Sequence, residues 1–167
     1  MIIKELKMPL KLEKLIALKR RTPIMLPKYS LIKDETARRL AGYRGECSLH
    51  YQLSLLPEKS YYILRGIRLK DGNHFFQIDN LLISQKFFLN LEVKTIAGTL
   101  QFDERNHQLI RTLDTKRDGF SDPLTQAYFQ EMHLKNWLKQ NGYTDLTILS
   151  LVVSANPSSI LETTSKK

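Results

Sequence analysis

The segment from His74 to Lys94, HFFQIDNLLISQKFFLNLEVK, constrains the fold of this chain more than any other segment. Two runs within it, Phe75–Ile83 and Phe87–Val93, are rich in aromatic and β-branched residues, and only residues 84–86 separate them. This pattern predicts two strands joined by a short turn. We therefore expect a β-hairpin at the centre of the fold.

Three charged residues interrupt these apolar strands: Asp79 in the first, and Glu92 and Lys94 in the second. Side chains alternate between the faces of a strand, so Glu92 and Lys94 share one face with Asn90. A turn centred on residues 85 and 86 places Asp79 opposite Glu92, whereas a three-residue loop would shift the register by one. Like charges in opposite positions destabilise a sheet, and a divalent cation between them would reverse that effect.

The same residues resemble the metal-binding core of the PD-(D/E)XK nucleases, which has a carboxylate in one strand and Glu-x-Lys in the next. Further segments resemble the nuclease-related domain (NERD) family over residues 41–157. In chain order they are GYRGE at 42–46, FQID at 76–79, EVK at 92–94 followed by Gly98, and DPLTQ at 122–126. The resemblance implies an α/β fold with a restriction-endonuclease-like αβββαβ core, in which helices flank a mixed central sheet.

The resemblance also implies a divalent-metal-dependent nuclease that hydrolyses phosphodiester bonds, with DNA preferred over RNA as the substrate. Asp79 and Glu92 would bind Mg²⁺ or Mn²⁺ with the Val93 carbonyl as a backbone ligand, and Glu46 would bind through water or a second ion. Hard oxygen ligands of this kind are those that Mg²⁺ prefers.

Lys94 and Gln126 complete the expected catalytic set with Glu46, Asp79 and Glu92. Because Lys94 would stand among three carboxylates, we expect it to stay protonated and to orient the nucleophile. The resemblance implies that Gln126 faces the same site. From the residues alone, Glu92 and Lys94 also fit a solvated sheet edge, and Glu46 fits a helix surface.

An alternative function is a non-catalytic nucleic-acid-binding module on a nuclease-like scaffold, in which a basic N-terminal arm binds the polyanion. The acidic set favours catalysis, because buried acids repel phosphate and a pure binding module does not need them. Strand preference, sequence specificity, and endonuclease or exonuclease action stay open. The oligomeric state is open too, although cleavage of both strands would require two active sites, as in a homodimer.

Length and composition indicate one globular domain. The chain has 167 residues, 42% of them hydrophobic, which is enough for a sizeable core. The single cysteine, Cys47, excludes an internal disulfide and favours a cytoplasmic location. No apolar run approaches the roughly 20 residues that a membrane-spanning helix requires.

The predicted organisation has three parts: a basic N-terminal arm or short helix at 1–29, the nuclease-related domain at 30–157, and a polar C-terminal tail at 158–167. The first part holds eight Lys or Arg and two Glu, and so carries most of the net charge of +9. Leucines among its lysines predict a short amphipathic helix between Pro9 and Pro23, which packs on the domain or lies on an anionic surface. An extended connector is expected to follow it.

The remaining elements follow from periodicity and from turn residues. Gly42 and Gly45 are costly inside a helix, so we expect close packing of that helix on the sheet to offset them. In chain order we predict a helix from Asp34 to Pro57, a strand at 61–67, small strands within 95–103 and 108–113, a loop at 114–122, a helix from Asp122 to Asn141, and a strand at 147–154 buried on both faces.

Overall fold

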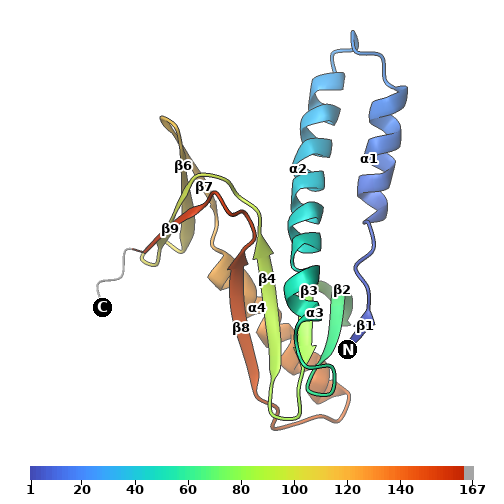
Figure 1. The fold of residues 1–167 in the computed structure, drawn as a ribbon, viewed down its shortest axis with the longest axis vertical. Coiled ribbons are helices and arrows are strands. Elements are labelled where there is room, and N and C mark those ends of the chain that lie inside the picture. The colour runs from blue at the N-terminus through green and yellow to red at the C-terminus, as the bar shows by residue number, and fades with distance from the viewer. Residues whose placement is uncertain (164–167) are drawn as a thin grey trace.

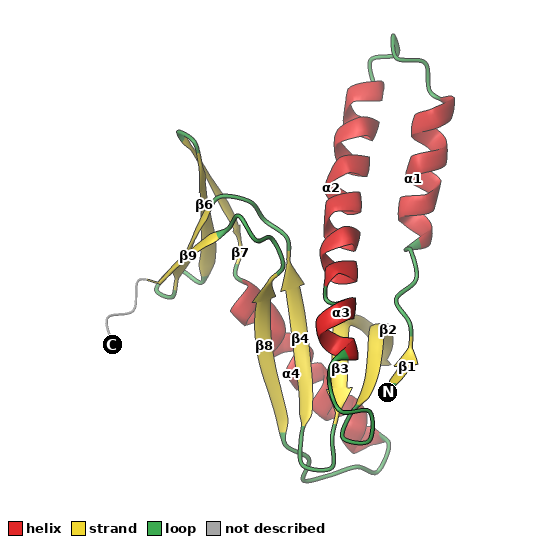
Figure 2. Cartoon of the chain, in the orientation of Figure 1, coloured by secondary structure: helices red, strands yellow, loops and turns green. Residues whose placement is uncertain are grey.

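The computed structural model describes residues 1–163 and contains two mixed β-sheets with helices around them (Figures 1 and 2). The main sheet has the strand order β1-β2-β3-β4-β8; its outer pairs β1–β2 and β4–β8 are parallel and its inner pairs antiparallel. The strand bounds are β1 Ile2–Lys4, β2 Tyr62–Asp71, β3 His74–Ile83, β4 Phe88–Lys94 and β8 Ile148–Ser154. The predicted α/β fold class with a mixed central sheet is confirmed.

The central hairpin, β3 and β4, has the predicted register. Asn80 lies opposite Leu91, and the pairing runs to the turn without a shift. The turn is closed by the Ser84 amide, which donates to the Phe87 carbonyl at 3.0 Å, while the Ser84 hydroxyl accepts from the Phe87 amide at 3.0 Å. A serine that caps both ends of the turn explains why a Gln-Lys pair, a weak turn former, can occupy its centre.

Two helices form a long hairpin that projects from one end of the main sheet (Figure 1). They are α1 (Leu10–Arg21) and α2 (Tyr29–Ser48), and the short α3 (His50–Ser54) follows. The expected extended connector is wrong: the Pro23 carbonyl accepts from the Leu26 amide at 3.1 Å, and the Leu26 carbonyl accepts from the Tyr29 amide at 2.9 Å. These two consecutive turns reverse the chain, and α2 begins at Tyr29, five residues before the expected start of the helix at Asp34.

The N-terminal part of the chain is integrated into the fold. Strand β1 pairs in parallel with β2, and α1 packs against α2 with Leu12 buried between them. The amphipathic helix predicted between the two prolines is present. No helix among residues 1–163 is long and apolar enough to cross a membrane.

The long helix α4 (Pro123–Gln140) covers one face of the main sheet, and α2 and α3 lie over the other (Figure 1). The predicted start of α4 is confirmed, because the Asp122 side chain accepts from the amides of Leu124 and Thr125.

The core has two layers, one on each face of the main sheet. Residues beneath α4 are Ile67, Phe76, Ile78, Leu81, Leu134, Leu138 and Ile148, and those beneath α3 are Leu53, Ile63, Leu82 and Leu91.

The second sheet has the strand order β7-β6-β5-β9, with β5 Thr99–Asp103, β6 Gln108–Leu113, β7 Lys116–Ser121 and β9 Ile160–Thr163. The loop predicted at 114–122 is wrong, because most of it is β7. Although this strand is polar, it pairs with β6, and its Asp118 forms an ion pair with Arg111 directly opposite. Strand β9, inside the expected polar tail, was not predicted; residues 164–167 of that tail lie outside the described residues.

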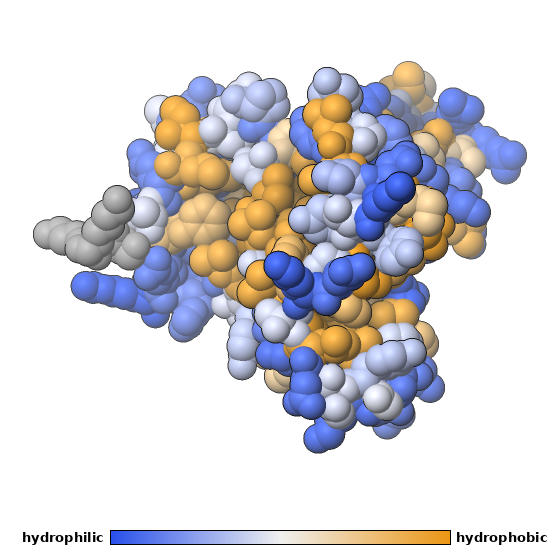
Figure 3. Space-filling model, turned by 60° about the horizontal axis from the view of Figure 1, so that its bottom comes forward, coloured by the Kyte–Doolittle hydropathy of each residue, from blue (hydrophilic) through white to orange (hydrophobic). Residues whose placement is uncertain are grey.

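Strand β8 lies at the edge of the main sheet, and the expectation that it is buried on both faces is wrong. Its Ile148 is buried, but Leu149 and Leu151 are 48% and 53% exposed. Figure 3, which brings the lower end of the molecule forward, shows apolar surface near the middle of the view. An apolar strand sequence thus indicates strand propensity here and not double-sided burial.

Candidate active site

The five predicted side chains come from four elements that meet at the carboxyl end of β4 (Figure 1). Glu46 lies near the end of α2, Asp79 lies on β3, Glu92 and Lys94 lie on β4, and Gln126 lies in the first turn and a half of α4. The pairing of β3 with β4 ends at Asn80 opposite Leu91, and just beyond it the Asp79 side chain accepts from the Val93 amide of β4. These residues are brought together from positions that are up to 80 residues apart in the sequence.

Lys94 links β4 to α4. Its ammonium group donates to Glu92 Oε1 at 2.7 Å and to Gln126 Oε1 at 2.8 Å. Glu92 is buried with only 2% of its surface exposed, so its charge requires a partner, and Lys94 supplies one. Gln126 therefore contacts the lysine of the predicted set.

The Gln130 amide holds Glu92 from the other side and is itself held by Asn90. Gln130 Nε2 donates to Glu92 Oε2 at 2.7 Å, and Gln130 Oε1 accepts from Asn90 Nδ2 at 2.9 Å. Sequence reasoning placed Asn90 on the correct strand face but gave it no role, and it missed Gln130. The available signal was the spacing of Gln126 and Gln130, because residues four apart share one face of a helix.

Asp79 has one bonded oxygen and an unfavourable charge environment. Its Oδ2 accepts from the Val93 amide at 2.9 Å. Burial, and then the negative charge of Glu92, raise the pKa of Asp79 to about 6, while the Val93 amide and Lys94 oppose this increase. At neutral pH the Asp79 carboxylate is therefore held in a site that disfavours its charge.

Glu46 shares this environment although it lies on a different layer of the fold. Burial raises the pKa of Glu46 to about 7, the negative charges of Asp79 and Glu92 add to the increase, and Arg65 opposes it. The mutual repulsion places the carboxylates of α2, β3 and β4 in one electrostatic cluster, which is defined here as the acid cluster: Glu46, Asp79 and Glu92.

Arg65 on β2 anchors the helix that carries Glu46. The arginine is buried, and its guanidinium donates to the Glu46 carbonyl at 2.6 Å and to Asn80 Oδ1 at 3.1 Å. This residue was missed in the sequence. The signal was the single charged residue of the apolar run 61–67, a position where a charge must find partners.

Close packing also brings α2 to the end of β4, but through only one of its two glycines. A Cβ atom on Gly45 would lie 1.5 Å from Thr95 Oγ1, so a side chain there would collide with the chain just after β4. A Cβ on Gly42 would meet nothing within 4 Å. The expected packing role is confirmed for Gly45 and is wrong for Gly42.

The acid cluster fits a hard divalent cation by its chemistry, although its side chains do not form a closed coordination shell. Among residues 1–163, no group of three or more His, Cys, Asp or Glu side chains is arranged to hold a metal ion. The donors are nevertheless carboxylate oxygens, the ligands that hard divalent cations prefer. Burial, and after it the neighbouring negative charges, raises the pKa values of Glu46 and Asp79, so a bound cation would favour their ionised forms.

Comparison with known proteins agrees with this geometry. A family model described as "NERD: Nuclease-related domain" matches residues 41–155, which include every residue of the site. No curated protein and no solved structure gave a significant match to the chain. The matched region covers more than half of the sequence, and the chain therefore belongs to the nuclease-related domain family.

Proposed function

We propose that this protein is a divalent-metal-dependent nuclease that hydrolyses phosphodiester bonds in DNA, with Glu46, Asp79, Glu92, Lys94 and Gln126 as its active site. The observation that carries the proposal is a lysine ammonium held between two side chains, beside carboxylates whose pKa values are raised. Such a cluster weakens the fold, and groups of this kind concentrate at functional sites. Membership of a nuclease-related family supports the same chemistry.

Lys94 supports the proposal through the geometry of its bonds. A lysine has three N–H donors, and two of them are used on Glu92 and Gln126. The third is available to an attacking water or to a phosphoryl oxygen, whose negative charge grows in the transition state. Because two partners hold the ammonium, this donor is in position before the substrate binds.

The carboxylates would hold Mg²⁺ or Mn²⁺, with Asp79 and Glu92 as direct ligands, the Val93 carbonyl as a backbone ligand, and Glu46 through water or a second ion. A cation bound there supplies Lewis acidity, which activates a water and neutralises phosphate charge. Two neighbouring residues would position the ligands of this cation: Arg65 donates to the backbone carbonyl of Glu46, and Gln130 donates to the Glu92 carboxylate. Without neutralisation, the acid cluster repels a phosphodiester.

A second candidate function is nucleic-acid binding without cleavage. Its support is the charge of the α1–α2 hairpin, where residues 10–48 contain ten Lys or Arg against four Asp or Glu. Such a surface releases counterions when it binds a polyanion. In this case the acid cluster would have no part in binding.

One experiment separates the two functions. Mg²⁺ and Mn²⁺ are titrated into the wild type, Asp79→Asn and Glu92→Gln by calorimetry, and each protein is incubated with linear, circular and single-stranded DNA and with RNA. The nuclease predicts that metal uptake and cleavage are both lost in the two variants. Glu104→Gln, which removes an exposed acid from the turn after β5, is the matched control and should behave as wild type.

Binding of nucleic acid that survives in both variants, with no metal uptake and no cleavage by the wild type, would leave the binding module as the function. Cleavage of RNA but not DNA would correct the substrate and keep the site. Each substrate is therefore offered separately and at the same nucleotide concentration.

A further inference from the structure

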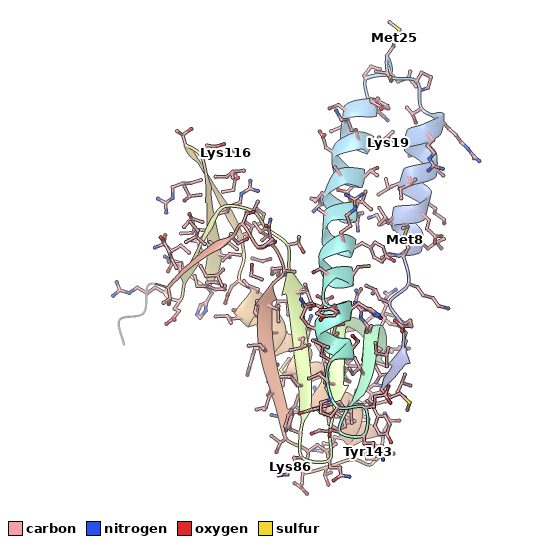
Figure 4. The ribbon with its side chains drawn as sticks, in the orientation of Figure 1. Met8, Lys19, Met25, Lys86, Lys116 and Tyr143 are labelled. Atoms are coloured by element: carbon pink, nitrogen blue, oxygen red, sulfur yellow. The ribbon has the colours of Figure 1, made fainter. Side chains whose placement is uncertain are left out.

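The turn between α1 and α2 carries apolar side chains that are exposed and do not contribute to the core. Met25 is 96% exposed, Ile24 is 77% exposed, and Leu26 between Met25 and Pro27 is also exposed. Figure 4 shows Met25 at the far end of the hairpin, away from both sheets. We define residues 22–28 as the hairpin tip.

The apolar surface continues from the hairpin tip onto both helices. Leu18 in the last part of α1 and Leu31 in the first turn of α2 are exposed, Leu31 by 70%. Water is a poor solvent for a surface of this kind, and concentrated patches mark interaction sites. The surface is not covered by any described part of the chain.

A basic collar surrounds this apolar end. The stretch from residue 14 to residue 33 contains six basic residues and no acidic one. They are Lys14, Lys19, Arg20, Arg21, Lys28 and Lys33. The partner of the hairpin tip must therefore combine an apolar interior with a negative surface.

A hollow beneath the tip has the same mixed character. It lies between α1 and α2 with a volume of about 570 Å³. Its walls include Ile16, Ile24 and Leu40, and Lys19 and Arg20 line it too. An acyl chain beside an anionic headgroup matches these two kinds of wall.

We propose that the hairpin tip binds the surface of an anionic lipid bilayer, inserting Ile24, Met25 and Leu26 at the boundary of headgroups and acyl chains. Apolar side chains enter this boundary while neighbouring basic side chains remain among the negative headgroups. The 20 residues of α2 span about 30 Å, so a tip held in the membrane leaves the acid cluster in water at the other end of the helix. The interaction is peripheral and does not depend on the proposed nuclease activity.

The breadth of the apolar surface favours a bilayer over a duplex. An apolar wedge in DNA parts a base step with one or two inserted side chains. Here the exposed apolar residues extend from Leu18 on α1 through three consecutive turn residues to Leu31 on α2. A base step cannot accommodate this width, whereas a bilayer interface has no such limit.

Sedimentation with lipid vesicles tests the proposal on the full chain. Vesicles of phosphatidylcholine alone are compared with vesicles that contain about 25% phosphatidylglycerol. We expect the wild type to bind the anionic vesicles. When Ile24, Met25 and Leu26 are all changed to Ser, its partition onto these vesicles should fall by a factor of roughly ten or more. The change Lys19→Gln combined with Arg20→Gln should weaken binding to anionic vesicles and make it less sensitive to salt.

Tyr143→Ser is the matched control, because Tyr143 is also exposed but lies at the opposite end of the molecule (Figure 4). It should leave partition unchanged, and thermal unfolding checks that the triple variant is folded. Absence of vesicle binding by the wild type overturns the proposal. So does binding that the triple variant retains in full, since the tip would then not insert. Duplex binding or self-association that the triple variant loses, without vesicle binding, would assign the tip to DNA or to a second copy.

Discussion

The two halves of the proposed site differ in how their charges are compensated. On the α4 side, Glu92 is bonded to Lys94 and Gln130, and Lys94 is bonded to Gln126. The other half consists of Glu46 on α2 and Asp79 on β3, whose pKa values burial raises to about 7 and about 6. The charges of the first half are paired within the chain, whereas the second half holds two buried carboxyl groups whose charged forms are disfavoured by burial and by the neighbouring acids. The difference locates the place where an external positive charge would be most stabilising.

The largest effect is expected when the compensated half loses its cation. Lys94→Met should lower the free energy of unfolding by about 3 kcal/mol, because Glu92 would remain buried without its charged partner. It should also reduce any metal-dependent cleavage by at least about a hundredfold. Urea unfolding and cleavage rates measure the two effects.

Lys86→Met is the control for Lys94→Met, since Lys86 lies exposed in the turn between β3 and β4. Its unfolding free energy should match the wild type within about 0.5 kcal/mol. Equal stability of Lys94→Met and Lys86→Met would contradict the assignment of Lys94 as the partner of Glu92.

A smaller effect is expected when the two halves are pushed apart. Gly45→Ala should destabilise the protein by about 2 kcal/mol, because its methyl group would overlap Thr95 and displace α2 from the end of β4. Gly42→Ala is the matched control on the same helix. It should instead raise the unfolding free energy by up to about 1 kcal/mol, since a methyl group there meets open space. Opposite signs in thermal unfolding support the packing contact, and equal signs would argue against it.

The smallest effect is expected from neutralising the uncompensated half. Asp79→Asn should raise the unfolding free energy of the metal-free protein by roughly 1–2 kcal/mol at pH 8, because a buried charge is removed while the Val93 amide keeps an acceptor. This sign is opposite to that of Lys94→Met. A loss of stability in Asp79→Asn would mean that the two halves are not distinct.

The pH dependence of stability follows from the same raised pKa values. The ordinary pKa values are 3.8 for Asp79 and 4.5 for Glu46, so between about pH 4 and pH 7 the folded chain binds more protons than the unfolded chain. The free energy of unfolding of the metal-free protein should therefore fall as pH rises through this range. In the double variant Asp79→Asn/Glu46→Gln the fall should be reduced, and saturating Mg²⁺ should reduce it in the wild type. Urea unfolding midpoints at several pH values measure this fall in stability for each protein.

Local patterns in the sequence were sufficient for the elements that depend on short-range rules. The central hairpin, its register near the turn, the start of the helix at Asp122 and the amphipathic helix between Pro9 and Pro23 all follow from alternation, periodicity or capping chemistry. Predictions from local patterns failed where long-range partners decide whether a segment forms a strand or is buried. Strand β7 looked like a loop because its polar residues are stabilised by β6, and β8 looked buried on both faces because an apolar strand sequence does not state which of its faces the rest of the chain covers.

The sequence by itself determined that Glu92 and Lys94 share a strand face, that Asp79 lies on the neighbouring strand of the hairpin, and which family the chain belongs to. For Glu46 the residues alone left a helix surface open, and the tertiary structure decided that it lies near Asp79 and Glu92, because the position of a helix is set by contacts such as those of Arg65 and Gly45 and not by its own periodicity. The structure alone also placed the apolar turn at the far end of the hairpin, since exposure depends on what the rest of the chain covers.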